Sequence, residues 1–280
     1  MQGEREFRVT RVTPSGAEEF ADILAVEEPL EIRVVFGPEV NRRSKSLSIT
    51  MRTPGNDFEL ASGFLLSENI VRKPADIVSF EHVGPAEGES EHGNTLMVEF
   101  ANDVPFETEK LQRHFYTTSS CGVCGKASME AVRAQGIAPL DAGLSVDRHV
   151  IFELPTGLRE QQSVFDRTGG LHAAGLADQS GAFVGIREDV GRHNAVDKLI
   201  GSQMLAKSFP LSDKILVVSG RASFELVQKA IMASIPMLVA VGAPSSLAVE
   251  LAEEFNLTLI GFTSSKRFNI YSHGEAVMDN

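Results

Sequence analysis

The sequence predicts an α/β fold, in which a smaller β-rich α+β domain precedes a larger domain whose mixed or parallel sheet has helices on both faces. Three observations favour this fold. Short apolar runs alternate with helical segments in the second half, strand-like runs fill the first hundred residues, and the two cysteines stand together between these regions. We expect the small domain over 1–115, a mobile Cys-x-x-Cys loop over 116–126 and the larger domain over 127–280.

In the small domain, strands are predicted from short runs of β-branched or alternating residues. These runs lie at 7–12, 30–36, 46–51, 77–83 and 95–100. The turn Thr53-Pro54-Gly55 comes before 57–66, whose apolar residues fall roughly on one face, so we expect a helix there. The acidic stretch 87–91 has glycines close on both sides and is expected to be a solvated hairpin loop.

In the larger domain, three apolar runs lie at 215–218, 237–241 and 257–260. Helical segments at 223–234 and 245–255 join them, so successive runs start 22 and 20 residues apart, as right-handed βαβ crossovers require. Upstream, 172–177 and 183–187 could form a hairpin over Ser180-Gly181. A helix from about 192 to 205 follows.

The composition favours some classes of protein and excludes others. The chain has 280 residues, 42% hydrophobic and 23% charged, which is ordinary for a soluble globular protein of one large domain or two. A net charge of −12 argues against a nucleic-acid-binding surface. The sequence starts with no signal-peptide pattern and contains no long apolar run. We therefore expect a cytoplasmic protein without membrane contact, whose thiols are free.

The only two cysteines, Cys121 and Cys124, lie in a run of serines and glycines. Gly122 and Gly125 free the backbone on either side of a thiol, and a helix is predicted from Lys126. The N–H groups at the start of a helix and the charge of Lys126 favour a thiolate at Cys124. The pattern indicates a pair of exposed, reactive sulfurs.

Three other roles for the cysteines fit the sequence less well. Burial as structural cysteines fits a Ser/Gly loop poorly. A zinc site needs four ligands, but there is no second Cys-x-x-Cys and the only close histidine is His114, so no structural metal is expected. A thioredoxin-like redox pair is the stronger rival, although its motif should follow the first strand of a βαβ unit.

Glycine-bearing corners recur where these elements end, at 168–170, 189–194, 219–223 and 241–246. Three of them lead into predicted helices, and Arg192 and Arg221 supply positive charge, so we expect an anion site at the carboxyl ends of the strands. Ordinary capped turns are the alternative. His172 and His193 are either pocket residues or structural histidines. The loop 262–267 could hold a phosphate or a base edge, or be a plain polar hairpin.

These motifs, taken in order, resemble those of the FdhD family, the sulfur carrier proteins required for formate dehydrogenase activity. The resemblance runs from about Pro29 to the C-terminus and rests on five segments: Cys121–Gly125, Thr168–Ala174, Arg187–Lys198, Ser219–Arg221 and Arg267–Tyr271. It implies a sulfurtransferase. A cysteine desulfurase would load Cys121, with Cys124 in support, and the sulfur would pass to the molybdenum of bis(molybdopterin guanine dinucleotide) before this cofactor enters formate dehydrogenase.

The resemblance also implies a homodimer, and it implies that the guanine dinucleotide contacts fall near one loop. The residues of that loop are Phe262, Thr263, Ser264, Ser265, Lys266 and Arg267. We add Arg192, His193 and Arg221 as candidate cofactor-binding residues. Two other functions stay open: a cofactor chaperone that does not transfer sulfur, and a dithiol–disulfide oxidoreductase.

The larger domain of that family is similar in fold to cytidine deaminases, which place His-x-Glu and Pro-Cys-x-x-Cys at successive helix starts. Here the corresponding segments are His193-Asn-Ala195 and Ser219–Ser223. Ala195 stands in place of the catalytic glutamate and neither zinc cysteine is present, so we do not expect deamination.

Overall fold

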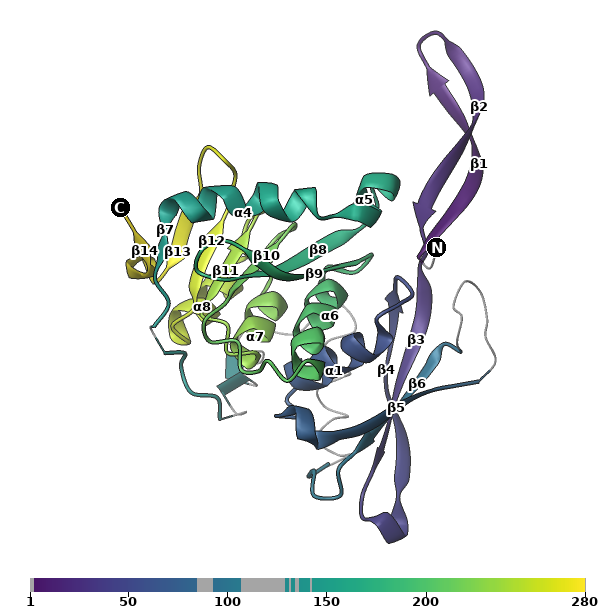
Figure 1. The fold of residues 1–280 in the computed structure, drawn as a ribbon, viewed down its shortest axis with the longest axis vertical. Helices are drawn as coiled ribbons and strands as arrows, with labels where there is room; N and C mark the ends of the chain where they lie inside the picture. Colours follow the sequence, from purple (N-terminus) through teal and green to yellow (C-terminus); the bar gives the residue numbers. More distant parts are fainter. Residues whose placement is uncertain are drawn as a thin grey trace.

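The structure is a computed structural model that describes residues 3–84, 93–106, 129–130, 132–133, 136–141 and 143–279. It contains a four-stranded sheet, a six-stranded sheet, a two-stranded ribbon and a short two-stranded pair (Figure 1). The Cys-x-x-Cys loop and the predicted helix start at Lys126 lie outside the described residues, and so does the acidic stretch 87–91.

The four-stranded sheet has the order β4-β3-β6-β5. Its strands are β3 (Glu28–Phe36), β4 (Arg43–Arg52), β5 (Ile77–Val83) and β6 (Thr95–Phe100). Buried residues alternate along β3, where Leu30, Ile32 and Val34 face the core, as expected for a strand with one covered face. The predicted strands are confirmed here, although β3 and β4 extend beyond their predicted bounds. Helix α1 (Asp57–Ser67), also predicted, packs on this sheet.

A long ribbon precedes this sheet and projects away from the body (Figure 1). It pairs β1 (Glu4–Thr13) with β2 (Gly16–Ala25) in antiparallel register. The sequence predicted a strand only at 7–12, because the alanines and acidic residues of β2 have low strand propensity. At the base of the ribbon, Nε of Arg167 donates to the carboxylate of Glu4 at 2.8 Å.

The six-stranded sheet has the order β13-β12-β11-β10-β8-β9. Its strands are β8 (His172–Ala177), β9 (Phe183–Asp189), β10 (Ile215–Val218), β11 (Met237–Ala240), β12 (Thr258–Gly261) and β13 (Asn269–Ser272). The pairs β10–β11 and β11–β12 are parallel, whereas β8 and β13 run antiparallel to their neighbours. The sheet is therefore mixed, as predicted, and β13 is an addition.

Helices cover both faces of this sheet, which confirms the predicted layering (Figure 1). Alternate strand residues point to opposite faces: Leu216 and Leu238 join the core on one side, Val217 and Val239 the core on the other. The first side is covered by α6 (Arg192–Leu205), α7 (Phe224–Met232) and α8 (Ser246–Glu254), and the second by α4 (Arg148–Glu160). None of the helices in these described ranges combines the length and the apolar composition that a membrane span requires.

Helix α4 and the short α5 (Ser163–Thr168) were not predicted from the sequence. Pro155 and Gly157 lie inside α4, and both residue types disfavour a helix interior. The burial of Ile151, Leu154 and Leu158 against the sheet outweighs that local preference. A short pair also forms here, between β7 (Val146–Asp147) and β14 (Val277–Met278).

Helices α1 and α6 join the two sheets at a point where their backbones touch. A Cβ atom on Gly63 would lie 1.9 Å from the carbonyl oxygen of Asp197, and one on Gly201 would lie 1.8 Å from that of Glu59. Only glycine permits such an approach. One continuous hydrophobic core therefore runs from the four-stranded sheet through α1 and α6 to the six-stranded sheet.

Candidate functional site

The loops that follow β10, β11 and β12 lie side by side at one edge of the large sheet. Ala222 and Pro244 form an isolated parallel bridge, which extends the pairing of β10 with β11. The N–H of Gly242 donates to the carbonyl of Gly220 at 2.9 Å, and the N–H of Phe262 donates to the carbonyl of Gly242 at 3.0 Å. These are the carboxyl ends of parallel strands, where open α/β sheets bind their ligands.

The N-terminus of α6 brings Arg192 and His193 to the same edge. Nε2 of His193 lies 3.3 Å from Oγ of Ser223 and 3.9 Å from the carboxylate of Glu225. Burial of the ring, followed by the positive charges of Arg192 and Lys229, lowers the pKa of His193 to about 4. The imidazole is therefore neutral at neutral pH, and it can donate or accept a hydrogen bond without adding charge.

Further polar groups complete this edge. Nε of Arg192 is buried and has no hydrogen-bond partner within the described ranges. His172 begins β8, and its pKa is lowered by desolvation of the ring and then by the charge of Arg192. Arg221 is exposed on the loop after β10. These residues place positive charge and neutral imidazoles together, an arrangement that suits an anionic ligand.

The loop after β12 presents the remaining predicted residues. Phe262 has a left-handed backbone and a side chain that is 44% exposed, whereas Thr263 is buried and its hydroxyl has no partner among the described residues. The N–H of Ser264 donates to the carbonyl of Arg267 at 2.9 Å, and the Ser264 hydroxyl accepts from the N–H of Arg267 at 3.3 Å. The resulting tight turn leaves both of its cations, those of Lys266 and Arg267, in solvent.

Most of the segment from Arg187 to Lys198 has a structural role that sequence reasoning missed. Asp189 accepts hydrogen bonds from Nζ of Lys198 at 2.7 Å, from the N–H groups of Thr53 and Gly191 at 3.1 and 2.8 Å, and from Nδ2 of Asn194 at 3.1 Å. The Asp189 and Lys198 side chains are 0% and 2% exposed. This buried cluster ties the edge of the large sheet to the turn after β4.

Two further ion pairs support the same junction. The guanidinium of Arg187 holds the carboxylate of Glu59 with Nε–Oε2 and Nη2–Oε1 distances of 2.5 and 2.7 Å. Nζ of Lys229 contacts both carboxylate oxygens of Asp197 at 2.7 and 2.8 Å. For the second pair, the sequence signal was charge at positions of α6 and α7 that face the core.

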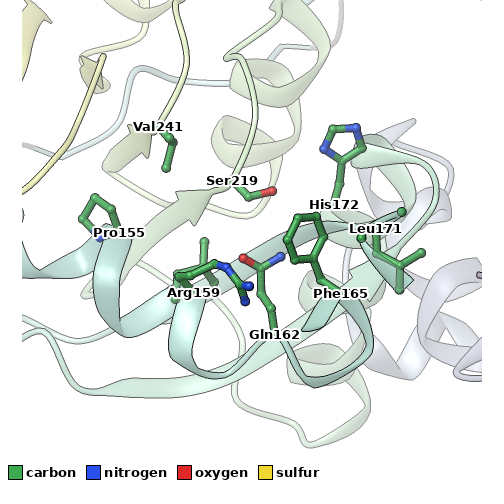
Figure 2. A pocket seen from close by; sticks show the side chains of 11 residues that line it. Pro155, Arg159, Gln162, Phe165, Leu171, His172, Ser219 and Val241 are labelled. Carbon is green, nitrogen blue, oxygen red and sulfur yellow. The ribbon is translucent and has the colours of Figure 1, made fainter. Parts of the chain in front are cut away.

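A pocket of about 520 Å³ opens at this edge, on the face of the sheet that α4 covers (Figure 2). Its lining comes from α4, α5, the start of β8 and the ends of β10 and β11. The lining residues are Pro155, Leu158, Arg159, Gln162, Phe165, Gly169, Gly170, Leu171, His172, Ser219 and Val241. None of the residues 262–267 lines it. This pocket was not predicted from the sequence, because α4 and α5 were not predicted.

The two segments compared with the zinc-binding corners of deaminases meet in the structure through the contact between His193 and Ser223. Across the described ranges, no group of three or more His, Cys, Asp or Glu side chains is placed to hold a metal ion. Cys121 and Cys124 lie outside those ranges, so their predicted roles and the expected lack of a structural metal remain predictions.

Comparison with known proteins places the chain in a family. Residues 25–278 match the FdhD/NarQ family. A protein from Nocardia farcinica, described as a sulfur carrier protein FdhD, is 50% identical over 270 residues, which cover 95% of this chain and 91% of that one. A protein of the same description from Saccharolobus solfataricus is 41% identical over 273 residues and 98% of both chains.

A crystal structure gives the same fold. A proposed formate dehydrogenase accessory protein from Desulfotalea psychrophila superimposes with a TM-score of 0.74 over 98% of this chain and 99% of that one, at 22% sequence identity. The matched residues 25–278 contain both sheets, the carboxyl edge and the Cys-x-x-Cys motif. The chain belongs to the FdhD/NarQ family.

Proposed function

We propose that this chain is a sulfurtransferase required for formate dehydrogenase activity. It takes sulfur from a cysteine desulfurase and delivers it to the molybdenum of bis(molybdopterin guanine dinucleotide), which is its substrate. The observation that carries the proposal is that the only cysteines of this FdhD/NarQ chain, Cys121 and Cys124, form one Cys-x-x-Cys motif. The description of its relatives as sulfur carrier proteins supports it.

In the loading step, the Cys121 thiolate attacks the outer sulfur of the persulfide on the desulfurase. An S–S bond forms at Cys121, the S–S bond of the donor breaks, and the donor cysteine leaves as a thiolate. The step moves one sulfur atom without net oxidation. A thiolate rather than a thiol is the nucleophile, which is why a Gly/Ser loop before a predicted helix suits Cys121 and Cys124.

In the delivery step, the Cys124 thiolate attacks Sγ of Cys121 and expels hydrosulfide. The two cysteines become a disulfide, and their oxidation reduces the transferred sulfur to sulfide. Hydrosulfide and a proton then replace an oxo ligand of molybdenum, which leaves as water. A cellular dithiol reductant restores both thiols. Because an external thiol can substitute for Cys124, its loss is expected to impair transfer less than the loss of Cys121.

The carboxyl edge of the large sheet is the proposed place for the dinucleotide part of the substrate. Arg192, Arg221, Lys266 and Arg267 would neutralise its diphosphates, because bonds between cations and phosphate are the strongest available to such a ligand. The exposed ring of Phe262 offers a stacking surface, and Thr263, Ser264, Ser265 and the neutral His193 offer hydrogen bonds. A homodimer is expected from the family resemblance alone.

The rival functions predict different behaviour. A cofactor chaperone that transfers no sulfur would bind the dinucleotide and leave Cys121 unmodified by the desulfurase. A dithiol oxidoreductase would cycle through a Cys121–Cys124 disulfide of defined potential without a persulfide.

Complementation of a deletion strain tests the proposal. Cys121→Ala is expected to abolish formate dehydrogenase activity, Cys124→Ala to reduce it, and the loop control Ser119→Ala to leave it near the wild-type level. Melting temperatures of the purified variants show whether each is folded. Full dehydrogenase activity with Cys121→Ala would refute the sulfur-carrier function.

A further inference from the structure

Helix α5 forms one wall of the pocket, yet it does not belong to a hydrophobic core. It has six residues, none of them buried, and the two cores found among the described residues include no side chain of this helix. Helices this short are marginal in water, and in proteins most of a helix's stability comes from packing of its apolar face. Contacts of another kind must therefore hold α5 in place.

Two polar contacts tie α5 to the rest of the large domain. The carboxylate of Glu188, on β9, accepts the N–H groups of Val164 and Phe165 at 3.0 and 2.8 Å. The guanidinium of Arg159, near the end of α4, pairs with Asp166 at 2.5 Å and lies 4.7 Å from the centroid of the Phe165 ring. These contacts are made by exposed or half-buried side chains, so water can replace them when α5 moves away.

The third contact comes from the ribbon, whose base lies beside α5 (Figure 1). Nε of Arg167 donates to both carboxylate oxygens of Glu4, at 2.8 and 3.0 Å, and the two side chains are 38% and 8% exposed. Next to this pair, a Cβ atom on Gly170 would lie 3.5 Å from Cβ of Ala25. The ribbon continues into β3, so this contact joins α5 to the small sheet.

The chain on the C-terminal side of α5 is suited to a hinge. Gly169 and Gly170 follow the helix directly and precede β8. Gly169 has a left-handed backbone with a φ of 65°, and nothing lies within 4 Å of a Cβ atom added there. Glycine adopts other backbone conformations at little steric cost, and hinges are formed by a few loop residues that absorb such changes. The helix can therefore swing without disturbing β8.

We propose that α5 is a lid over the pocket, which opens about Gly169 and Gly170, and that the pair of Glu4 and Arg167 latches it to the ribbon. In the closed position the lid places Phe165 in the pocket wall (Figure 2). Opening exposes to water the N–H groups and charges that the three contacts satisfy. The inference rests on the proposed function, because a lid at this edge controls how a substrate reaches the sheet and leaves it.

A latched lid sets the rates of binding more than the affinity. A ligand that does not touch the latch enters and leaves only while the lid is open. Loss of the latch therefore raises the association and the dissociation rate by one factor, and Kd, their ratio, stays the same. A residue that contacts the ligand behaves differently, because its loss weakens binding mainly through faster dissociation. The two rates together distinguish a latch from a binding residue.

Hydrogen exchange of the α5 amides, measured on the full-length protein by mass spectrometry, tests the lid without a ligand. The variants are Arg167→Leu, Glu4→Gln and the double variant that combines them. The matched control is Arg148→Leu, because Arg148 is an exposed arginine at the other end of α4, paired with Asp279 at 3.0 Å. Melting temperatures show whether each variant is folded.

We expect both single variants to speed hydrogen exchange in α5 by about twofold to fivefold, since ion pairs near the surface contribute modestly, and Arg148→Leu to exchange at the wild-type rate. The double variant should be no faster than either single variant, because both substitutions remove one contact. The lid is refuted if either single variant exchanges as slowly as the wild type, or if the two effects multiply in the double variant.

Stopped-flow binding of guanosine diphosphate that carries a fluorescent label on the ribose tests the effect on the rates. Arg167→Leu should raise the association and dissociation rates together and leave Kd unchanged, and Arg148→Leu should change neither rate. A higher Kd at an unchanged association rate would make Arg167 a ligand contact and would contradict the latch.

Sulfur loading of Cys121 by a desulfurase, measured on the same preparations, separates this inference from the proposed function. The latch variants are expected to load normally. Normal loading with wild-type hydrogen exchange in α5 would refute the lid alone. Faster hydrogen exchange in a protein that never accepts sulfur would refute the sulfur-carrier function and support the lid.

Discussion

The ends and the middle of one short segment behave differently in this molecule. Asp189 and Lys198 are buried and paired with each other at the junction of the two sheets, whereas Arg192 and His193, between them in sequence, reach the carboxyl edge. The same stretch of chain therefore holds the junction together and supplies the candidate site. Residues of one sequence motif need not share one role, and their burial and partners separate the roles.

The largest effect is expected where a buried pair is broken. Lys198→Met would leave the Asp189 carboxylate buried without its cation, which costs about 3–5 kcal/mol. We expect denaturant unfolding to show that loss. Lys266→Met is the control, because Lys266 is exposed on the loop after β12, and its free energy of unfolding should change by less than about 0.5 kcal/mol. Equal effects of the two substitutions would contradict the assignment of Lys198 to the junction.

A second test concerns the contact of α1 with α6. Gly63→Ala would place a methyl group 1.9 Å from the carbonyl of Asp197, so the helices must separate, at a cost of about 3 kcal/mol. Gly143→Ala is the matched control, since nothing lies within 4 Å of its added Cβ. Thermal unfolding of both variants checks this. A melting temperature unchanged by Gly63→Ala would show that the two sheets are not held by this helix crossing.

Substitutions at the junction are expected to change stability. Substitutions in the candidate site are expected to change ligand binding and to leave stability unaltered. Arg221→Ala removes an exposed cation at the carboxyl edge, and each charge-assisted hydrogen bond is worth roughly 1.5–3 kcal/mol. We expect guanosine diphosphate to bind about tenfold more weakly, by calorimetry, with no measurable change in unfolding. Arg43→Ala, an exposed arginine on β4, serves as the control. Identical affinities in both variants would show that the diphosphate does not bind at this edge.

The last test is a pH dependence from His193, whose pKa is about 4 in the folded protein against an ordinary value of 6.5. The unfolded chain binds this proton more readily, so stability is fully present above pH 6.5 and falls as pH drops from 6.5 towards 4. His193→Gln should lessen that fall. An NMR titration of the ring should give a midpoint near 4, and a midpoint near 6.5 would show that the ring is not held in this environment.

The sequence predicted the fold wherever local pattern and tertiary packing agree. The parallel strands β10, β11 and β12 lie in short apolar runs, and the spacing of these runs predicted the βαβ units. Helix α4 was not predicted because Pro155 and Gly157 disfavour a helix locally. Burial of Leu154 against the sheet stabilises the helix all the same. Packing between residues far apart in the sequence is not indicated by any local sequence pattern.

The residues of the candidate site were also predicted only in part. Arg192, Arg221 and the loop from Phe262 to Arg267 were predicted to gather because each follows or begins an element at the carboxyl edge, and the structure places them there. Gln162 was not predicted, since its pocket exists only once α4 and α5 pack on the sheet. A pocket that forms through tertiary packing can be recognised only after the fold is known.

The central claim, that Cys121 carries sulfur, is tested most directly by intact-mass analysis after incubation with a cysteine desulfurase and cysteine. We predict that the wild-type chain and Cys124→Ala each gain the mass of one sulfur atom, located at Cys121 and removed by a reductant, and that Cys121→Ala gains none. A wild-type chain that stays unmodified while the desulfurase turns over, or a Cys121→Ala chain that is loaded as fully as the wild type, would contradict the account.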